Sequence, residues 1–401
     1  MDLYKGSLYW PTTLANLEVP EYPILNKEVI CDCLVIGGGM SGALCSYLLA
    51  DESLDIILVD KRKVSTGSSS ANTGLLQYAN DKMLHEFAES IGEEKAVRFY
   101  KLCYEAMKKL QAVAESLDSD VQFQSRKSLY YATDKNDVEK LQKEYNLLKK
   151  HGFDAEYLIE EEIEKIYGFK KPAAILTTGD AEINPQMFVR ELIKEAHQKN
   201  VQVFEHTKVT EEGFHNGYWK FTSDNGVIYA KKVIYSTGYE GINFAKKEGG
   251  ELNRTYAIAT SPLPEFSMWK DQCLIWETKR PYFYMRTTFD GRIVAGGLDE
   301  DQVEAPSDPE ILARYGDNLL KRIKDHFPGY QVEADYVYGA TFGESDDGMP
   351  YIGEHPEKKN IFYCLGYGGN GTVYSMFGAE ILKDLIIYGN HPDWDLVRLD
   401  R

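Results

Sequence analysis

The chain has 401 residues, of which 43% are hydrophobic and 27% charged, and its formal net charge at pH 7 is −18. This length exceeds what one compact core supports and predicts two domains. The negative charge argues against nucleic acid and anionic membrane surfaces as partners, because both are polyanions. The first ten residues lack the basic and apolar blocks of a secretory signal, and no apolar stretch predicts a membrane span, so we expect a cytoplasmic protein.

Residues 31–60 carry the pattern of a dinucleotide-binding unit. An apolar strand over 33–36 enters a glycine turn over 37–42, a helix extends to Ala50, and a second strand covers 55–60. A lone glycine triplet is a weak signal. Here the strand, turn, helix and second strand follow one another in register, which is the context that supports nucleotide binding.

Each glycine of this turn has a distinct expected role. Gly37 permits the tight turn, Gly39 lets backbone N–H groups approach a pyrophosphate, and Gly42 lets the helix pack close to the sheet. The N-terminus of the helix then faces the anion. Asp60 ends the second strand 18 residues after Gly42, where an acidic side chain accepts hydrogen bonds from a ribose diol.

The middle of the chain predicts alternating helices and strands. A loop rich in Ser and Gly covers 61–77, and apolar residues at helical spacing over 82–117 predict two helices broken at Gly92. The segments expected next are a strand over 128–133, a helix over 134–151, a strand over 174–177, a helix with Asn184 as N-cap and Pro185 as first residue, a strand over 201–204, a hairpin around Gly217 and a strand over 232–238.

The C-terminal part predicts a β-rich region and a second glycine-rich site. The runs 282–286 and 292–296 flank Asp290-Gly291, which is a hairpin signature. The segments expected after this hairpin are a helix over 308–326, a glycine turn over 347–353, a strand over 361–364, a glycine turn over 365–371 and a helix over 375–388. Small-residue turns at the ends of strands are where open α/β sheets bind ligands.

The cysteines do not indicate a metal site. Their spacings fit neither a zinc site nor a disulfide framework, so we expect reduced, buried side chains and no bound metal. The six are Cys31, Cys33, Cys45, Cys103, Cys273 and Cys364.

The dinucleotide unit, the turn Ser236-Thr-Gly238 and the glycine turn before the last helix together resemble the D-amino-acid oxidase superfamily of FAD-dependent oxidoreductases. Residues 347–353 look like its glycine oxidase and gamma-glutamylputrescine oxidase branches, and the tail over 355–401 is especially similar to glycine oxidase. The resemblance implies an α/β fold. It consists of a doubly wound, Rossmann-like FAD-binding domain of the glutathione-reductase type and an interleaved substrate domain of antiparallel sheet plus helices. The FAD-binding segments are 1–120, 180–245 and 335–401, and the substrate-binding segments are 121–179 and 246–334.

The resemblance also implies which residues contact the cofactor. They are Gly37, Gly39, Met40, Ser41, Gly42, Asp60, Lys61, Arg62, Ser68, Ser69, Thr73, Gly74, Leu75, Val209, Thr237, Gly238, Gly366, Gly368, Gly369, Asn370, Gly371 and Thr372. Relatives with covalent flavin carry an attachment histidine or cysteine, whereas the corresponding neighbourhoods here are 70–73 and 338–342 and contain neither. We therefore expect noncovalent FAD.

The reaction implied by the resemblance is oxidation of the C–N bond of a small amine or amino acid. A hydride passes to flavin N5, and oxygen or another acceptor then reoxidises the flavin, with hydrogen peroxide as the product in the oxygen case. Phe342 stands about where glycine oxidase has the arginine that clamps the substrate carboxylate, so we expect a larger N-substituted amine to be a better substrate than glycine. The alternatives are an NAD-dependent dehydrogenase, which Asp60 also suits, and a flavin-binding protein without turnover. The oligomeric state stays open.

Few side chains are obligatory for this chemistry, and four are candidates for positioning the substrate. Arg286 shares a strand face with Tyr284 and is placed to clamp an anionic substrate, although a surface arginine beside Asp290 and Asp299 is an equal alternative. Tyr256 and Gln77 are candidates for lining the flavin cavity, with ordinary packing as the alternative for an aromatic residue.

Overall fold

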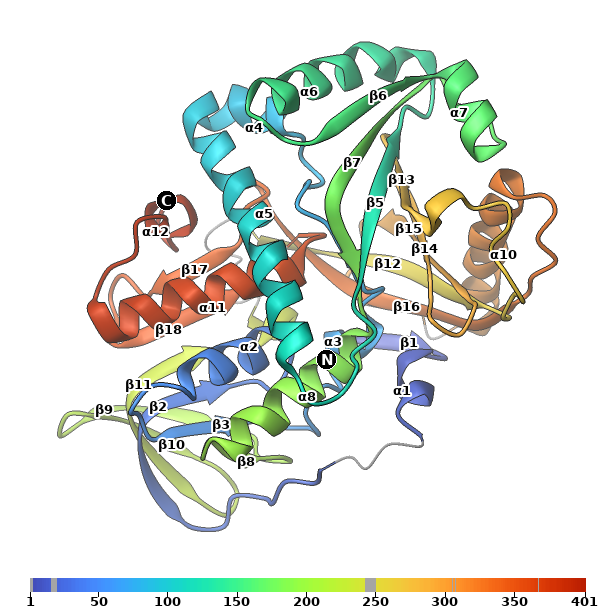
Figure 1. Cartoon of the computed structure of the whole chain (residues 1–401). Helices are drawn as coiled ribbons and strands as arrows, with labels where there is room; N and C mark the ends of the chain where they lie inside the picture. Colours follow the sequence, from blue (N-terminus) through green and yellow to red (C-terminus); the bar gives the residue numbers. More distant parts are fainter. Residues whose placement is uncertain (1–2, 16–19, 242–249, 305, 307, 367) are drawn as a thin grey trace.

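The computed structural model describes residues 3–401 except 16–19, 242–249, 305, 307 and 367. Its described strands form an eight-stranded and a ten-stranded sheet, with helices packed around both (Figure 1). The expected mixed α/β architecture is confirmed. The expected domain boundary at 245/246 and one residue of the glycine turn over 365–371 lie outside the described residues.

The eight-stranded sheet, which we call the nucleotide sheet, has a mainly parallel centre. Its strands are β2 (Glu28–Ile36), β3 (Ile56–Val59), β8 (Gln202–Phe204), β9 (Thr210–His215), β10 (Tyr218–Thr222), β11 (Val227–Tyr235), β17 (Tyr351–Glu354) and β18 (Ile361–Leu365). Their order is β17-β18-β11-β2-β3-β8, and β10 pairs with β11 and β9. The pairs β18/β11, β11/β2, β2/β3 and β3/β8 are parallel.

Two different layers cover the nucleotide sheet. Along β2, Cys33 and Val35 pack on the side of the helices α2 (Met40–Leu49) and α11 (Gly371–Tyr388). Leu34 packs on the other side, together with residues of the β9–β10 hairpin. Apolar residues therefore follow one another without alternation in the central strands, as is expected of a parallel sheet buried on both faces.

The ten-stranded sheet, which we call the cap sheet, is mainly antiparallel. Its strands are β1 (Tyr4–Gly6), β4 (Leu75–Leu76), β5 (Gln124–Tyr131), β6 (Ala155–Ile159), β7 (Ala173–Glu182), β12 (Gly250–Thr260), β13 (Leu274–Glu277), β14 (Phe283–Thr287), β15 (Ile293–Glu300) and β16 (Ala334–Ser345). The path β1-β16-β12-β15-β14-β13-β5-β7-β4 is joined by β6, which pairs with β7. β16 belongs to this sheet although the expected division places 335–401 with the nucleotide segments, and the domain division stays a prediction.

The remaining helices surround the two sheets. They are α1 (Trp10–Thr13), α3 (Ser68–Ala71), α4 (Leu84–Ile91), α5 (Glu93–Ser116), α6 (Val138–Lys150), α7 (Glu160–Tyr167), α8 (Pro185–Gln198), α10 (Pro309–His326) and α12 (Trp394–Val397), with short 3-10 turns over 135–137, 238–241 and 270–272. In Figure 1, α10 covers the cap sheet on the side away from the nucleotide sheet, and α5 runs beside α11 and α2. None of the described helices is long and apolar enough to cross a membrane.

Several local predictions are confirmed. The helix pair over 82–117 breaks at Gly92, whose φ of +87° suits glycine. Asn184 caps α8, since its side chain accepts a hydrogen bond from Met187 N at 3.1 Å. The hairpin at Asp290-Gly291 joins β14 to β15. The six cysteines are all buried and form no disulfide in the described structure.

Other boundaries were wrong, and tertiary contacts explain most of them. β7 extends to Glu182, well past the expected 174–177, because it pairs with β5 along its length and with β4 at its end. The helix expected over 375–388, α11, begins at Gly371, so the end of the glycine turn is already its first turn. The helix expected over 134–151 begins as a 3-10 turn.

Candidate active site

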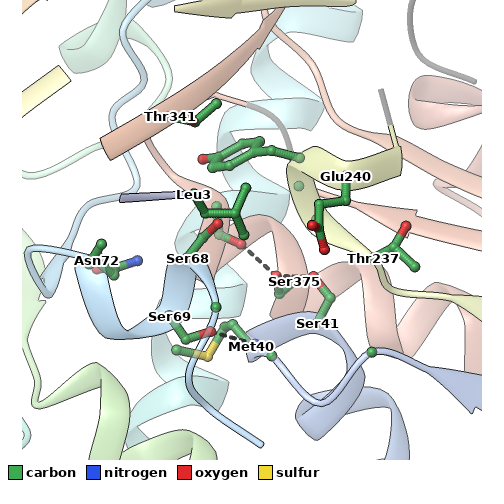
Figure 2. A pocket seen from close by; sticks show the side chains of 18 of the residues that line it. Leu3, Met40, Ser41, Ser68, Ser69, Asn72, Thr237, Glu240, Thr341 and Ser375 are labelled. Atoms are coloured by element: carbon green, nitrogen blue, oxygen red, sulfur yellow. Dashed lines mark hydrogen bonds between the residues drawn. The ribbon is translucent and has the colours of Figure 1, made fainter. Parts of the chain in front are cut away.

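A cavity of about 560 Å³ lies where the two sheets meet, and residues of both sheets line it. We call it the central cavity. Figure 2 shows side chains from α2, α3, α11 and the 237–241 turn converging on it. The carboxyl ends of β2 and β3 open into it, as expected for a ligand site in an open α/β sheet.

The glycine turn after β2 forms a close backbone cradle. Gly37 has a φ of +110°, and a Cβ there would lie 2.4 Å from Ser236 O. A Cβ on Gly42 would lie 1.8 Å from the Gly37 carbonyl oxygen, so only glycine lets α2 begin so close to the strand. Met40 N donates to Ser69 Oγ at 3.0 Å, which ties α3 to the start of α2 (Figure 2). The N-terminus of α2 therefore borders the cavity, where its N–H dipoles favour an anion.

The acidic residue at the end of β3 is held rigidly. Asp60 Oδ2 accepts from Gly38 N, and Asp60 Oδ1 accepts from Arg62 N, both at 2.7 Å. Burial raises the pKa of Asp60, an effect that these backbone hydrogen bonds oppose. Glu240 pairs with Lys61 at 2.7 Å and with Arg62 at 3.0 Å. A carboxylate oxygen has two lone pairs, so Asp60 keeps acceptor capacity for a ribose diol.

The glycine turn before α11 forms the facing backbone surface. Gly368 N donates to Gly343 O at 2.7 Å, and Gly369 N donates to Asp81 Oδ2 at 3.0 Å. Asn370 Nδ2 donates to Ala79 O at 2.8 Å. These contacts fasten the turn to β16 and to the segment after β4.

The structure brings together almost all of the predicted cofactor residues. Every one of them lines the central cavity except Gly42 and Gly74, which lie directly behind its wall. Gly74 has a φ of +75°, and a Cβ there would lie 2.3 Å from Arg286 Nη2. Their individual contacts with a cofactor stay predictions.

The expected place of Arg286 was wrong in both alternatives, since its side chain neither lines the cavity nor lies at the surface. The guanidinium donates from Nε to Thr73 O at 2.8 Å, from Nη2 to Ile183 O at 2.8 Å and from Nη1 to Thr287 O at 3.1 Å. It also lies over the ring of Trp10. Strand alternation predicted the correct face of β14 for Arg286. The loop around Thr73 lies between this side chain and the cavity, so Arg286 supports the cavity wall from behind.

Tyr256 fits both of its expected alternatives, cavity lining and ordinary packing. The residue borders the cavity, but its ring stacks on Tyr315 of α10 with centroids 3.7 Å apart and planes at 2°. Its hydroxyl donates to Glu300 Oε2 at 2.7 Å. The side chain therefore points toward α10, because the opposite face of β12 carries the cavity.

Gln77 and Tyr284 do line the cavity, as expected. They stand with further aromatic residues of the cap sheet that we call the aromatic wall, namely Trp276, Tyr282, Tyr284, Tyr338 and Phe342. The sequence analysis missed Trp276. No local motif marks this residue, since β13 reaches the cavity only by pairing with β5 and β14.

Carboxylates gather beside the aromatic wall. Asp81 lines the cavity. Burial and then the charge of Asp81 raise the pKa of Glu344 to about 6, and burial with the same neighbouring charge raises that of Asp299 to about 6. Arg280 donates to the backbone oxygen of Asp81 at 2.7 Å. Among the described lining residues, the cationic ones are Lys61, Arg62 and Lys208, which all adjoin strands of the nucleotide sheet.

Comparison with known proteins identifies the family. The sequence profile described as FAD dependent oxidoreductase (DAO) matches residues 32–385. The chain belongs to this family of FAD-dependent oxidoreductases. It is 25% identical to a glycine oxidase of Bacillus licheniformis over 89% of this chain and 93% of that protein. It is 22% identical to the mitochondrial dimethylglycine dehydrogenase of Homo sapiens over 99% of this chain, which spans 47% of that protein.

Solved structures of the family show the same fold. The structure of glycine oxidase from Geobacillus kaustophilus superposes with a TM-score of 0.79 at 18% identity, covering 93% of this chain and 99% of that one. The cofactor of the family is FAD, which sets aside the NAD-dependent alternative.

The residues present fit FAD. The close approach of Gly37 and Gly42 brings the N-terminus of α2 to the cavity, where a pyrophosphate is expected, and Asp60 stands where the adenosine ribose is expected. The 366–372 turn and Leu75 supply a second backbone surface for a flavin ring. Within the described ranges, no group of three or more His, Cys, Asp and Glu side chains is arranged to hold a metal ion.

Proposed function

We propose that this FAD-dependent oxidoreductase oxidises the C–N bond of a small amine, with oxygen as acceptor and hydrogen peroxide as product. The observation that carries the proposal is the central cavity, which continues from the dinucleotide cradle to the aromatic wall. When bound, FAD supplies a ring that accepts a hydride from a C–H bond. The protein's task is then to bind and orient the amine and to exclude water.

The lining residues suit that task. Trp276 stacks on Tyr130 with centroids 3.7 Å apart, which holds its ring rigidly in the wall. Tyr282 and Tyr284 continue the wall. Phe342 also lines the cavity, with an apolar ring about where the resemblance to glycine oxidase led us to expect a cationic clamp. These side chains shape the cavity and exclude water. They supply no strong nucleophile, and hydride transfer does not require one.

The charges favour an amine over a simple amino acid. Asp81 and the neighbouring carboxylates attract an ammonium group, whereas the cationic lining residues beside the nucleotide sheet are placed for the cofactor. A free α-carboxylate beside the aromatic wall has no arginine or lysine among the described lining residues to meet it there. An N-substituted amine is therefore the better substrate and glycine a poor one.

Anaerobic stopped-flow mixing tests the proposal. The holoenzyme is mixed with glycine, N-methyl amino acids, secondary amines and polyamine derivatives, and bleaching of the flavin absorbance is followed. We expect an N-substituted amine to bleach the flavin fastest and glycine slowly. Absence of bleaching with every amine would overturn the proposal, and rapid bleaching by glycine would overturn the substrate preference.

Two further measurements sharpen the result. Admission of air after bleaching should restore the absorbance with release of one peroxide per flavin, whereas a dehydrogenase would need an added electron acceptor. A Phe342→Arg variant should bind glycine more tightly than wild type, because it places a cation on the cavity wall. A Lys359→Arg variant at a lysine outside the cavity lining is the matched control and should leave glycine binding unchanged.

A further inference from the structure

Two residues of the cavity wall meet at one buried hydroxyl. Gln77 Nε2 and Trp276 Nε1 both donate to Ser128 Oγ, each at 3.0 Å. Gln77 and Trp276 line the central cavity, whereas Ser128 lies behind them on β5 and is 1% exposed. A hydroxyl oxygen accepts two hydrogen bonds and donates one, so these two donors fill its acceptor capacity. The Ser128 hydrogen must go elsewhere.

Asp180 is the acceptor that the structure offers for that hydrogen. A hydrogen bond from the Ser128 hydroxyl is among the causes that lower the pKa of Asp180, and its carboxyl also accepts from Tyr78 N at 3.0 Å and from Thr177 Oγ1 at 3.4 Å. The side chain is 1% exposed and forms no ion pair within the described residues. The nearest cation along β5, Arg126, pairs with Glu182 instead, at 2.8 Å. Burial raises the pKa of this carboxyl to about 7, and the neutral donors around it oppose that rise, so the carboxylate that accepts the Ser128 hydrogen is the main form above about pH 7.

This arrangement decides which way the Gln77 amide faces. The two ends of an amide differ, since the nitrogen only donates and the oxygen only accepts. Because Asp180 takes the Ser128 hydrogen, Ser128 Oγ presents only lone pairs, and it can pair with the nitrogen end of Gln77 but not with the oxygen end. Gln77 Oε1 is therefore turned away from Ser128, and no described residue donates a hydrogen bond to it.

We propose that Asp180 and Ser128 are positioning residues that hold Gln77 so that its Oε1 accepts a hydrogen bond from the N–H of the substrate amine. The inference rests on the proposed function and adds how the amine is oriented. The indole of Trp276 donates to the same hydroxyl. One buried network therefore fixes both the orientation of the Gln77 amide and the position of the adjoining Trp276 ring. A substrate without an N–H group gains nothing from Gln77.

Equilibrium binding to the holoenzyme tests this without turnover. The probes are tert-butylamine, which has N–H groups but no hydrogen on the carbon next to nitrogen, and tetramethylammonium, which has no N–H group. Binding is followed by flavin difference spectroscopy. Ser128→Ala and Gln77→Leu should each raise the Kd for tert-butylamine roughly tenfold, the loss expected for one hydrogen bond to a charged group. The Kd for tetramethylammonium should change less than about twofold in both variants.

A double-variant cycle separates positioning from packing. If Ser128 acts through Gln77, the Ser128→Ala change should add nothing to the Kd of the Gln77→Leu variant. Ser128→Thr, which keeps the hydroxyl, should bind tert-butylamine like wild type. Ser125→Ala, on the exposed part of the same strand, is the control and should change neither Kd.

Several outcomes would overturn the inference. They are equal weakening of both probes, additive losses in the double variant, no change in either single variant, and failure of the wild-type holoenzyme to bind tert-butylamine. If Ser128→Ala does not fold, Gln77→Leu alone still decides, because it leaves the bond between Ser128 and Asp180 in place. Flavin reduction by an amine with no change in these binding constants would leave the proposed function standing and reject this orientation of the amine.

Discussion

An Arg286→Met variant distinguishes two roles for Arg286, as a structural support of the cavity wall or as a clamp for the substrate. The side chain of Arg286 is buried, and its guanidinium donates to the backbone oxygens of Thr73, Ile183 and Thr287. Methionine fills much of the same volume but donates no hydrogen bond. Three carbonyl groups, two of them buried and that of Thr73 partly buried, therefore lose their partner in the Arg286→Met variant.

The expected loss of stability follows from these three contacts. An unpaired buried acceptor costs about 1–3 kcal/mol, so the three together cost about 3–9 kcal/mol. The lower half of this range applies, because the variant also removes a buried charge and because Glu182 keeps Arg126 as its partner at 2.8 Å. A loss of about 3–5 kcal/mol is a large share of the usual 5–15 kcal/mol and, because the unfolding entropy grows with the 401 residues of the chain, lowers Tm by only about 4–6 °C.

Thermal unfolding and flavin retention measure this effect. The Arg286→Met holoenzyme should unfold at lower temperature and release FAD more readily, because the Thr73–Leu75 segment loses its anchor. Arg286→Lys keeps the charge but not the fork of donors, and it should fall between methionine and wild type. Lys127→Met, at a half-buried lysine of β5 in the same sheet, is the control. A methionine variant with wild-type Tm that binds only acidic substrates more weakly would refute this reasoning and restore the clamp.

Four further outcomes are expected. Gly39→Leu should purify without flavin, because its side chain would extend from a Cβ already 3.3 Å from Ser69 Oγ into the pyrophosphate cradle. A folded variant with full flavin occupancy would show that the phosphate site lies elsewhere. Asp60→Ala should weaken FAD binding by about 1–3 kcal/mol in a flavin titration, the cost of a lost charged hydrogen bond, and an unchanged Kd would reject the ribose contact. Acid precipitation should release intact FAD into the supernatant, and colour in the pellet would indicate a covalent link. Burial raises the pKa of Asp180 from 3.8 to about 7. The folded state therefore binds this proton more tightly than the unfolded chain does. The free energy of unfolding falls as pH rises from about 4 to about 7, by at most about 4 kcal/mol. Urea unfolding at several pH values should show a flatter stability profile for Asp180→Asn, and parallel profiles would contradict the shift.

The nucleotide-binding unit could be predicted because its interactions are local. Gly37 and Gly42 meet across a single turn, so the requirement for glycine is visible within six residues of sequence. Asp60 follows at the end of the next parallel strand, which pairs directly with β2. Short-range sterics and hydrophobic runs are sufficient to specify such a unit.

The substrate side of the cavity was decided only by the tertiary structure. Strand alternation placed Arg286 on the right face of β14, but whether it reaches the cavity depends on Thr73, which lies 213 residues earlier in the chain. Ser128 meets Gln77 and Trp276 across 51 and 148 residues. These contacts arise from the order and register in which distant strands pair, and side-chain period alone carries no information on which strand becomes the neighbour.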